Sequence, residues 1–228
     1  MTSVGLALLL AAGPAHAGPD AKEIRRLQAC AEVLQEVMDV PEGIPKDLLH
    51  KSYCVVVIPS VKKAALGVGG RFGKGAAVCR TEGGRGAWGA PLMVTLGGGS
   101  FGLQIGGQSS DYVFLVMNPK GIDNLLKSKF TLGADCSVAA GPKGRSMEAA
   151  TDAQMRAEIL TYSRSRGVFA GLSLEGAVLK QDDDSNFDVY GGNVAAREVL
   201  SNPGFKIPSE ARPLVDALRT LSANHVSG

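Results

Sequence analysis

The spacing of apolar and polar side chains predicts one amphipathic helix near the start of the chain and a long region of short strands after it. Between residues 20 and 39, apolar side chains recur at steps of three and four, and charged side chains occupy the remaining surface. The turn residues Pro41-Glu42-Gly43 end this helix. From Tyr53 to about Lys180, β-like runs are separated by glycines, which predicts that most of the chain is antiparallel sheet. The apolar helix positions are Ile24, Leu27, Ala31, Leu34 and Met38, and the β-like runs cover 53–58, 63–70, 75–80, 91–97, 101–107, 111–117, 134–140, 158–164 and 168–180.

Three further helices interrupt or follow these strands. Asn118-Pro119 provides an N-cap residue and a first-turn proline for a short helix that carries Ile122 and Leu125. The apolar spacing near the end of the chain predicts two more helices, at about 193–201 and about 209–223.

The strand predicted at 111–117 decides the fold class. It is apolar on both faces, with Val113 and Leu115 on one side and Tyr112 and Phe114 on the other, so both faces must be covered. The many glycines favour bulges and tight bends over flat strands. We therefore expect an α+β fold. It comprises a strongly curved, Gly-rich antiparallel sheet or barrel-like sandwich, with the N-terminal amphipathic helix and the C-terminal helices packed outside.

The first 17 residues have the features of a secretory signal peptide. A run of small and apolar residues leads to Ala15-His16-Ala17, which fits the A-x-A pattern of a cleavage site. A core helix at the N-terminus is the alternative. We expect residues 18–228 to form a single domain that is exported, periplasmic or secreted, and peripheral to a membrane.

Four cysteines follow this segment: Cys30, Cys54, Cys79 and Cys136. An oxidising compartment would permit disulfides, and four cysteines allow three pairings. Cys54 and Cys79 lie in strand-like runs, where they are also compatible with small buried hydrophobic residues. The sequence leaves both the pairing and the presence of a disulfide open.

Composition and net charge limit the classes of function. The chain of 228 residues has 30 glycines and 11 prolines, but at 45% hydrophobic residues it is too apolar for a disordered or linker protein. A net charge of +2 is too small for a general nucleic-acid binder, so nucleic acid is not an expected partner.

Candidate catalytic and metal motifs receive little support. The glycine-rich segment 97–102 matches both a dinucleotide loop and a nucleophile elbow around Ser100, but each requires a helix directly after it, and residues 103–108 resemble another strand. A serine hydrolase using Ser100, with His50 or His225 as the base, remains a minor alternative. The acidic segment 181–188 lacks the glycine of an EF-hand and is interpreted as a solvated hairpin tip. We predict no catalytic residue, no metal and no cofactor.

Charge is unevenly distributed along the chain. Residues 51–90 contain seven basic side chains and one acidic one, whereas residues 171–190 contain five acidic side chains and one lysine. One face of the fold could therefore meet an anionic partner. Each Lys or Arg near an anionic bilayer contributes on the order of 1 kcal/mol, so four together would support reversible attachment. Ordinary solvated charges at strand ends are the alternative.

Several segments in a fixed order resemble the SYLF domain, a lipid-binding module whose yeast relatives are actin-binding regulators of endocytosis. The resemblance covers roughly residues 24–200. It rests on six segments, which cover residues 63–75, 88–91, 98–106, 132–135, 139–145 and 162–176.

The resemblance implies binding to acidic phospholipids through a basic surface and an N-terminal amphipathic helix. Carried onto this sequence, it indicates seven lipid-binding residues: Lys22, Arg25, Arg26, Lys62, Lys63, Arg71 and Lys74. The leading hypothesis is an exported bacterial member of the family, non-catalytic, that associates reversibly with an anionic phospholipid membrane surface. The alternative is an envelope protein–protein interaction or structural module, in which the helix at 20–39 packs as core and the basic face docks a protein partner.

Overall fold

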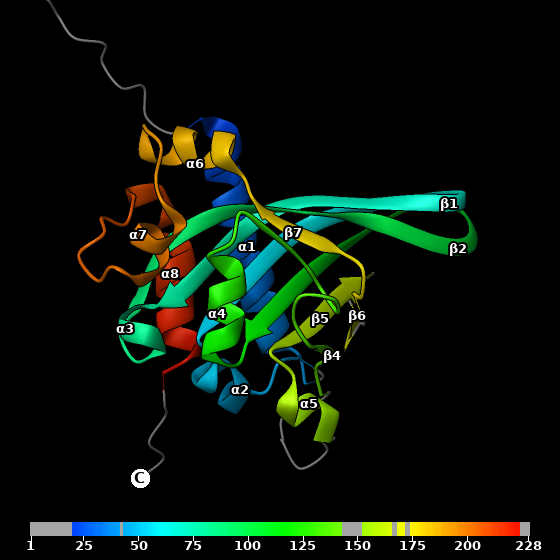
Figure 1. Cartoon of the computed structure of the whole chain (residues 1–228), viewed down its shortest axis with the longest axis horizontal. Helices are drawn as coiled ribbons and strands as arrows, with labels where there is room; N and C mark the ends of the chain where they lie inside the picture. The colour runs from blue at the N-terminus through cyan, green and yellow to red at the C-terminus, as the bar shows by residue number, and fades with distance from the viewer. Residues whose placement is uncertain (1–19, 42, 143–151, 166–167, 172–173, 224–228) are drawn as a thin grey trace, which may run out of the picture.

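A computed structural model describes residues 20–41, 43–142, 152–165, 168–171 and 174–223 (Figure 1). The predicted signal peptide at 1–17 lies outside these residues. The first element is α1 (Ala21–Asp39), which confirms the predicted N-terminal helix. A short helix α2 (Lys46–Lys51) follows it. No helix within the described ranges is long and apolar enough to cross a membrane.

Two long strands, β1 (Cys54–Arg80) and β2 (Trp88–Val116), build most of the sheet. They are joined by the short helix α3 (Thr81–Gly84) and pair antiparallel from Arg80 opposite Trp88 to Cys54 opposite Val116. Several strands that the sequence predicts separately are thus continuous. The shifts of register between Ile58 and Val61, Ala65 and Gly67, and Val78 and Arg80 bend the pair without ending it.

The β1/β2 ribbon projects beyond the helices and then doubles back (Figure 1). A straight strand would separate Cys54 from Cys79 by about 80 Å, yet their Cα atoms lie 3.9 Å apart and a disulfide joins them. Where the two halves of β1 cross, a Cβ atom on Gly75 would lie 1.9 Å from the carbonyl oxygen of Val57. Only glycine permits this approach of the two backbones.

The remaining strands extend β2 on either side of the bend. β7 (Val178–Gln181) pairs with its first half, and β3 (Lys129–Thr131) pairs with β7. β5 (Ile159–Ser165) pairs with its second half, and β5 in turn pairs with β4 (Val138–Ala140) and β6 (Val168–Gly171). The result is one strongly curled, half-barrel sheet of seven strands within the described residues, as expected from the glycines. β4 and β5 are parallel, which the sequence did not predict.

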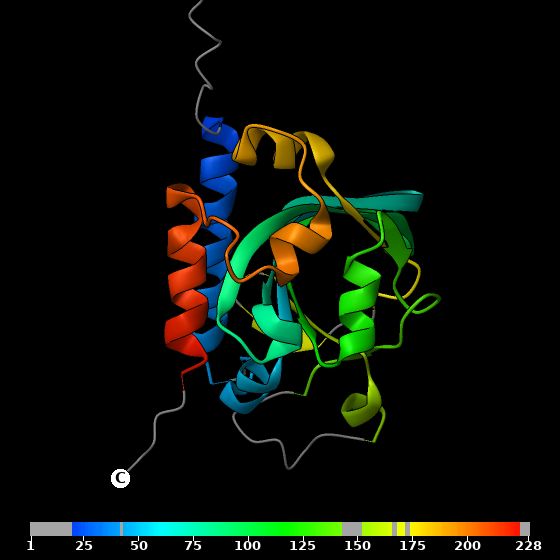
Figure 2. The same cartoon turned by 60° about the vertical axis from the view of Figure 1, so that its left-hand side comes forward.

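Helices cover both faces of the curled sheet. α1 and α8 (Arg212–Leu221) lie side by side on one face (Figure 2), and α8 follows a single 3-10 turn, η2 (Ser209–Ala211). α4 (Pro119–Leu125) and α7 (Ala196–Ser201) pack on the other face. Another short helix is α5 (Asp152–Arg156). As predicted for strand 111–117, Val113 and Leu115 join the core beneath α1, whereas Tyr112 and Phe114 join the core on the opposite face.

The interpretation of 181–188 as a solvated hairpin tip is wrong. Residues Asp183–Tyr190 form helix α6, and the side chain of Asp182 accepts a hydrogen bond from the backbone N–H of Ser185 as its N-cap. Two acidic residues in the first turn favour this helix through its dipole, and Gly191, with a positive φ of 70°, ends it. The acidic run is therefore the start of a helix.

Candidate functional site

The seven cations predicted to bind lipid do not form one patch. Three lie on α1 and four on β1, and Lys74 from the second group joins the α1 group. We name as the ionic cluster the set formed by Glu23, Arg26, Lys74, Asp182 and Ser185. It ties the first turns of α1 to β1 and to the N-terminus of α6.

Short polar contacts hold the ionic cluster together. Lys74 Nζ lies 2.7 Å from Asp182 Oδ2, and Arg26 Nη1 lies 3.9 Å from the same oxygen. Arg26 also pairs with Glu23, and the Ser185 hydroxyl donates to Glu23 Oε1 at 3.2 Å. Glu23 is fully buried and Asp182 nearly so, which explains why two cations are needed to balance the two carboxylates.

Asp182 is kept ionised inside this cluster. Burial opposes its ionisation, but the hydrogen bonds from Lys74 and Ser185 outweigh that effect and hold the pKa of the carboxyl below its usual range. Thr95 on β2 donates a further hydrogen bond to Asp182 Oδ2 at 3.2 Å. At neutral pH the charges of the ionic cluster therefore balance one another, and the cluster links α1, β1 and α6.

The acidic and basic windows of the sequence meet here. Asp182 and Asp188 come from the acidic window; Asp182 pairs with Lys74 and Arg26, and Asp188 lies 3.4 Å from the ammonium group of Lys22. Three of the seven cations thus contact carboxylates of the same chain. An anionic ligand would have to compete with these carboxylates for them.

The apolar face of α1 belongs to the core. Leu27 and Leu34 are 1% and 0% exposed, Met38 is also buried, and Ile24 is half-buried. Insertion of this face into a bilayer would require α1 to leave the sheet and α8. The geometry of α1 therefore agrees with the alternative in which this helix packs as core.

A second group of basic residues remains on the ribbon. We name as the ribbon patch Lys62, Lys63, Arg71 and Phe72. Within the part of the chain that the structure describes, its three cations have no carboxylate partner. Phe72 is 54% exposed, one of two large hydrophobic side chains that the described residues leave so open to solvent. Arg71 is half-buried, and its buried Nε atom has no hydrogen-bond acceptor among the described residues.

The crossing of the two halves of β1 brings the two stretches of strand that carry these residues near each other, with the exposed Lys62 and Phe72 next to the half-buried Lys63 and Arg71 in sequence. A Cβ atom on Gly73 would lie 2.8 Å from Cγ2 of Val61 and 2.9 Å from Cγ2 of Ile58, so the two halves of β1 lie against each other at Gly73. Val61 is buried, and Lys62 next to it is exposed, as alternation along a strand requires. Sequence reasoning found the cations but missed Phe72, although an aromatic residue beside a basic one was a usable signal.

The arrangement around Ser100 differs from a nucleophile elbow. Ser100 pairs with Gly69 inside β2, and the strand continues to Val116 without the helix that an elbow requires. His50 lies at the end of α2, with Nδ1 3.1 Å from the carbonyl oxygen of Ser222. His225 lies outside the described residues. Among those described, no group of three His, Cys, Asp or Glu side chains has the arrangement of a metal site.

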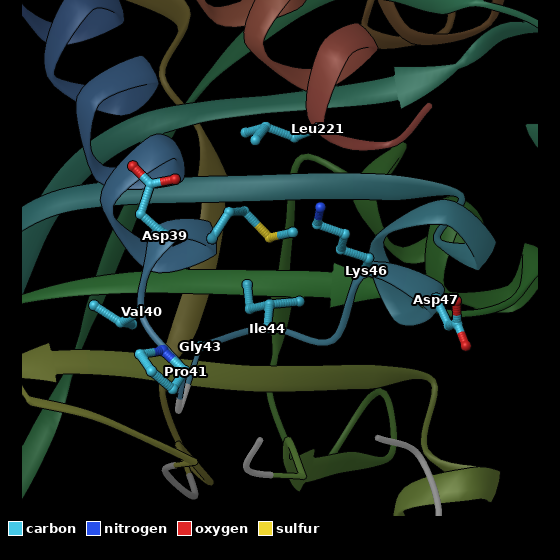
Figure 3. A pocket seen from close by; sticks show the side chains of 9 residues that line it. Asp39, Val40, Pro41, Gly43, Ile44, Lys46, Asp47 and Leu221 are labelled. Atoms are coloured by element: carbon cyan, nitrogen blue, oxygen red, sulfur yellow. The ribbon is translucent and has the colours of Figure 1, made fainter. Parts of the chain in front are cut away.

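A cavity of about 400 Å³ lies where α1, α2 and α8 meet (Figure 3). Eight of its nine described lining residues come from the single segment 38–47, and the ninth comes from the end of α8. Its lining residues are Met38, Asp39, Val40, Pro41, Gly43, Ile44, Lys46, Asp47 and Leu221.

Comparison with known proteins finds a consistent set of relatives. Residues 97–221 match the family model described as Ysc84: Las17-binding protein actin regulator. The chain is 34% identical over 189 residues to an SH3 domain-containing protein of Schizosaccharomyces pombe, covering 82% of this chain and 43% of that protein. It is 31% identical over 209 residues to LAS seventeen-binding protein 3 of Saccharomyces cerevisiae, covering 90% and 45%. The SH3 domain-containing YSC84-like protein 1 of Xenopus laevis is 34% identical over 184 residues, covering 80% and 54%. The chain spans about half the length of the curated relatives it matches.

Proposed function

Since the chain belongs to the Ysc84 family, whose shared module is the SYLF domain, we propose that it is a non-catalytic binding protein. Its ligand in this proposal is an anionic phospholipid surface, bound reversibly through the ribbon patch. The observation that carries the proposal is the presence on the bent ribbon of three cations without carboxylate partners among the described residues, on the same strand as the exposed ring of Phe72.

The chemistry of the ribbon patch suits the surface of a bilayer. Three cations near anionic headgroups contribute about 3 kcal/mol in total. Phe72 can place its ring among the acyl chains just below the headgroups, which adds roughly 1–2 kcal/mol for partial burial. A total of about 4–5 kcal/mol corresponds to a dissociation constant near 1 mM or somewhat below, which is reversible attachment. The unpartnered Nε of Arg71 would find an acceptor in a phosphate oxygen.

The remaining predicted cations have a different part in this proposal. Arg25 is exposed on α1 and can add long-range attraction, whereas Lys22, Arg26 and Lys74 would have to exchange carboxylates for phosphates. α1 stays docked in the core, because its release would expose Leu27 and Leu34 and break the ionic cluster. Binding through the ribbon patch requires neither event.

Vesicle co-sedimentation with matched variants tests this proposal. Lys62→Gln/Lys63→Gln/Arg71→Gln should abolish pelleting with phosphatidylglycerol vesicles at low salt. The control Lys120→Gln/Arg197→Gln/Lys206→Gln removes the same charge from exposed sites on other elements and should pellet almost as well as the parent. If both triple variants lost pelleting to the same extent, net charge alone would explain the effect. Pelleting that depends neither on the salt concentration nor on the charge of the lipid would overturn the proposal.

A protein partner is the second candidate, and the matched family's own description favours it. That family is described as a Las17-binding protein actin regulator, so relatives of this chain are named for protein ligands. An acidic protein surface could engage the same three cations. A purified partner whose binding survives the ribbon variant, while vesicle binding does not, would separate the two ligands.

We further propose that the protein is exported and peripheral to a membrane. The signal-like sequence at residues 1–17 and the Cys54–Cys79 disulfide, which belongs to an oxidising compartment, support this location. Mass spectrometry of the protein recovered from its native cell should find Gly18 as the first residue. An intact N-terminus on a fully cytosolic protein would contradict the proposal.

A further inference from the structure

A second pocket, of about 360 Å³, lies where the end of α6 meets the segment 205–210 that leads into η2. Two aromatic rings line it: those of Tyr190 and Phe205 meet edge to face, with their centroids 5.3 Å apart. The Tyr190 hydroxyl donates a hydrogen bond to the carbonyl oxygen of Pro91, which holds this ring in place. A volume at the lower end of the usual range for binding pockets, roughly 300–1,000 Å³, suits one bulky side chain or a small molecule. Val189, Val194 and Pro208 complete the apolar lining.

The apolar surface continues beyond the pocket along the exposed face of α6. Phe187 on this helix is 49% exposed. Residues three and four positions apart share a face of an α-helix, so Phe187 lies beside Tyr190 on the same side of α6. A small molecule held in the pocket would leave the Phe187 ring in water, whereas a longer ligand would cover both. The pocket and this ring together therefore favour a peptide segment of a partner protein.

The face of α6 around Phe187 is acidic. Asp183 and Asp184 lie four and three positions before it, so they border the same face, and both are exposed. Neither pairs with a cation among the residues that the structure describes. The pocket itself is lined by one cation and one anion, Lys206 and Glu210, so its own charges balance. The two aspartates therefore give this surface its net negative charge, which favours a basic partner.

We propose that the pocket and the exposed face of α6 dock a short segment of a partner protein, whose bulky aromatic side chain enters the pocket and whose Lys or Arg meets Asp183 and Asp184. Tyr190 follows Asp184 by six residues, which is about 9 Å along the helix axis. An extended segment advances about 3.3 Å per residue, so the basic residue would lie about three positions from the aromatic one. The Phe187 ring then packs against the residues between them. This inference does not rest on the proposed function.

An NMR titration of the full, ¹⁵N-labelled chain tests this inference with two synthetic peptides. One is Gly-Ser-Trp-Ser-Gly-Arg-Gly-Ser, and the other has the reverse order, because the direction of the segment is open. We expect at least one of them to bind with a dissociation constant below about 1 mM and to shift the backbone amide signals of α6 and of residues 205–210. Replacing the peptide's Trp by Ala, or its Arg by Glu, should weaken binding roughly tenfold. Absence of binding by both peptides would overturn the proposal, and equal binding of the Glu peptide would overturn the assignment of the two aspartates.

Matched variants locate the site. Ser209→Trp adds bulk at an exposed position of the lining and should abolish peptide binding. Asp183→Asn/Asp184→Asn should weaken the peptide about fivefold or more. The control Glu32→Gln/Asp123→Asn removes the same charge from exposed sites on α1 and α4, and should change affinity less than about twofold. Unchanged affinity in folded Ser209→Trp, or peptide-induced shifts in the parent that avoid residues 205–210, would overturn the pocket as the site.

The two exposed phenylalanines separate this inference from the proposed function. Phe187→Ser should weaken the peptide about fivefold, and Phe72→Ser should leave its affinity unchanged. In vesicle pelleting we expect the reverse, so each proposal can fail without the other. Equal peptide affinity in the two variants would overturn the part assigned to Phe187. A dimer of the parent chain in sedimentation velocity that Phe187→Ser abolishes would overturn the choice of a partner protein and indicate a second copy of this chain.

Discussion

Replacing Lys74 tests whether this cation belongs to the fold or to the ligand surface. The substitution Lys74→Met keeps the aliphatic stem and removes the ammonium group that lies 2.7 Å from Asp182. Breaking a fully buried pair costs about 3–5 kcal/mol. The side chain of Lys74 is 33% exposed, and Arg26 remains near the same carboxylate, so solvent screening and the second cation reduce this cost. We expect a loss of about 1–2 kcal/mol in the free energy of unfolding at pH 7, after this reduction.

The assay is urea unfolding followed by far-UV circular dichroism, with Lys63→Met as the matched control. The control should stay within about 0.5 kcal/mol of the parent, because Lys63 has no carboxylate partner among the described residues. In thermal melts, Lys74→Met should lower the midpoint by roughly 2–8 °C for a chain of this size. Pelleting with anionic vesicles should fall in Lys63→Met and stay close to the parent in Lys74→Met.

The pH dependence of the same comparison provides a second check. The pKa of Asp182 is lower in the folded protein than in the unfolded chain, so its ion pair stabilises the fold above the ordinary carboxyl pKa of about 4. This contribution is lost as the pH falls further and Asp182 becomes protonated. The difference between parent and Lys74→Met should therefore be constant near neutral pH and shrink progressively as the pH falls below about 4. A stability equal to that of the parent at pH 7, or a difference that does not shrink below pH 4, would refute the reasoning.

Three further predictions concern the fold that carries the ribbon patch. In the urea titration, Gly75→Ala should lower the free energy of unfolding by about 3 kcal/mol or more, because its Cβ atom would meet a backbone carbonyl oxygen. The control Gly99→Ala, whose Cβ atom would enter open space, should change it by less than about 1 kcal/mol. Leu34→Ala should cost about 2–5 kcal/mol in that titration, as expected for a core position; a cost below about 0.5 kcal/mol would mean that α1 is not docked. Replacing Cys54 and Cys79 together by alanine should remove about 3–4 kcal/mol, as expected for a closed segment of 25 residues, and a reductant should then have no further effect on the melting temperature.

The sequence predicted those features that depend on local periodicity. The three- and four-residue spacing gave the helix at α1 almost to the residue, and Asn118-Pro119 correctly marked the start of α4. The two apolar faces of strand 111–117 correctly required a sheet covered on both sides. These features follow from neighbours in sequence, which is why they could be predicted.

Features set by contacts between distant segments were not predictable in the same way. The pairing of Cys54 with Cys79 depends on β1 doubling back, which local patterns do not encode. Likewise, charge windows along the sequence could not distinguish Lys74, which is neutralised by Asp182, from Lys62, which is not. The helix at 183–190, by contrast, was missed although its signals are local: an Asp N-cap, acidic residues in the first turn and Gly191 at its end.

The most direct test of the account places a fluorescent reporter at the ribbon patch. The chain has a single tryptophan, Trp88, which is 2% exposed, so its emission should not respond to lipid. In Phe72→Trp, the new indole replaces the exposed ring. We predict a blue shift of its emission with phosphatidylglycerol vesicles at low salt, and no shift with phosphatidylcholine vesicles or at high salt. A protein that pellets with anionic vesicles while the emission of this tryptophan stays unchanged would contradict the central claim.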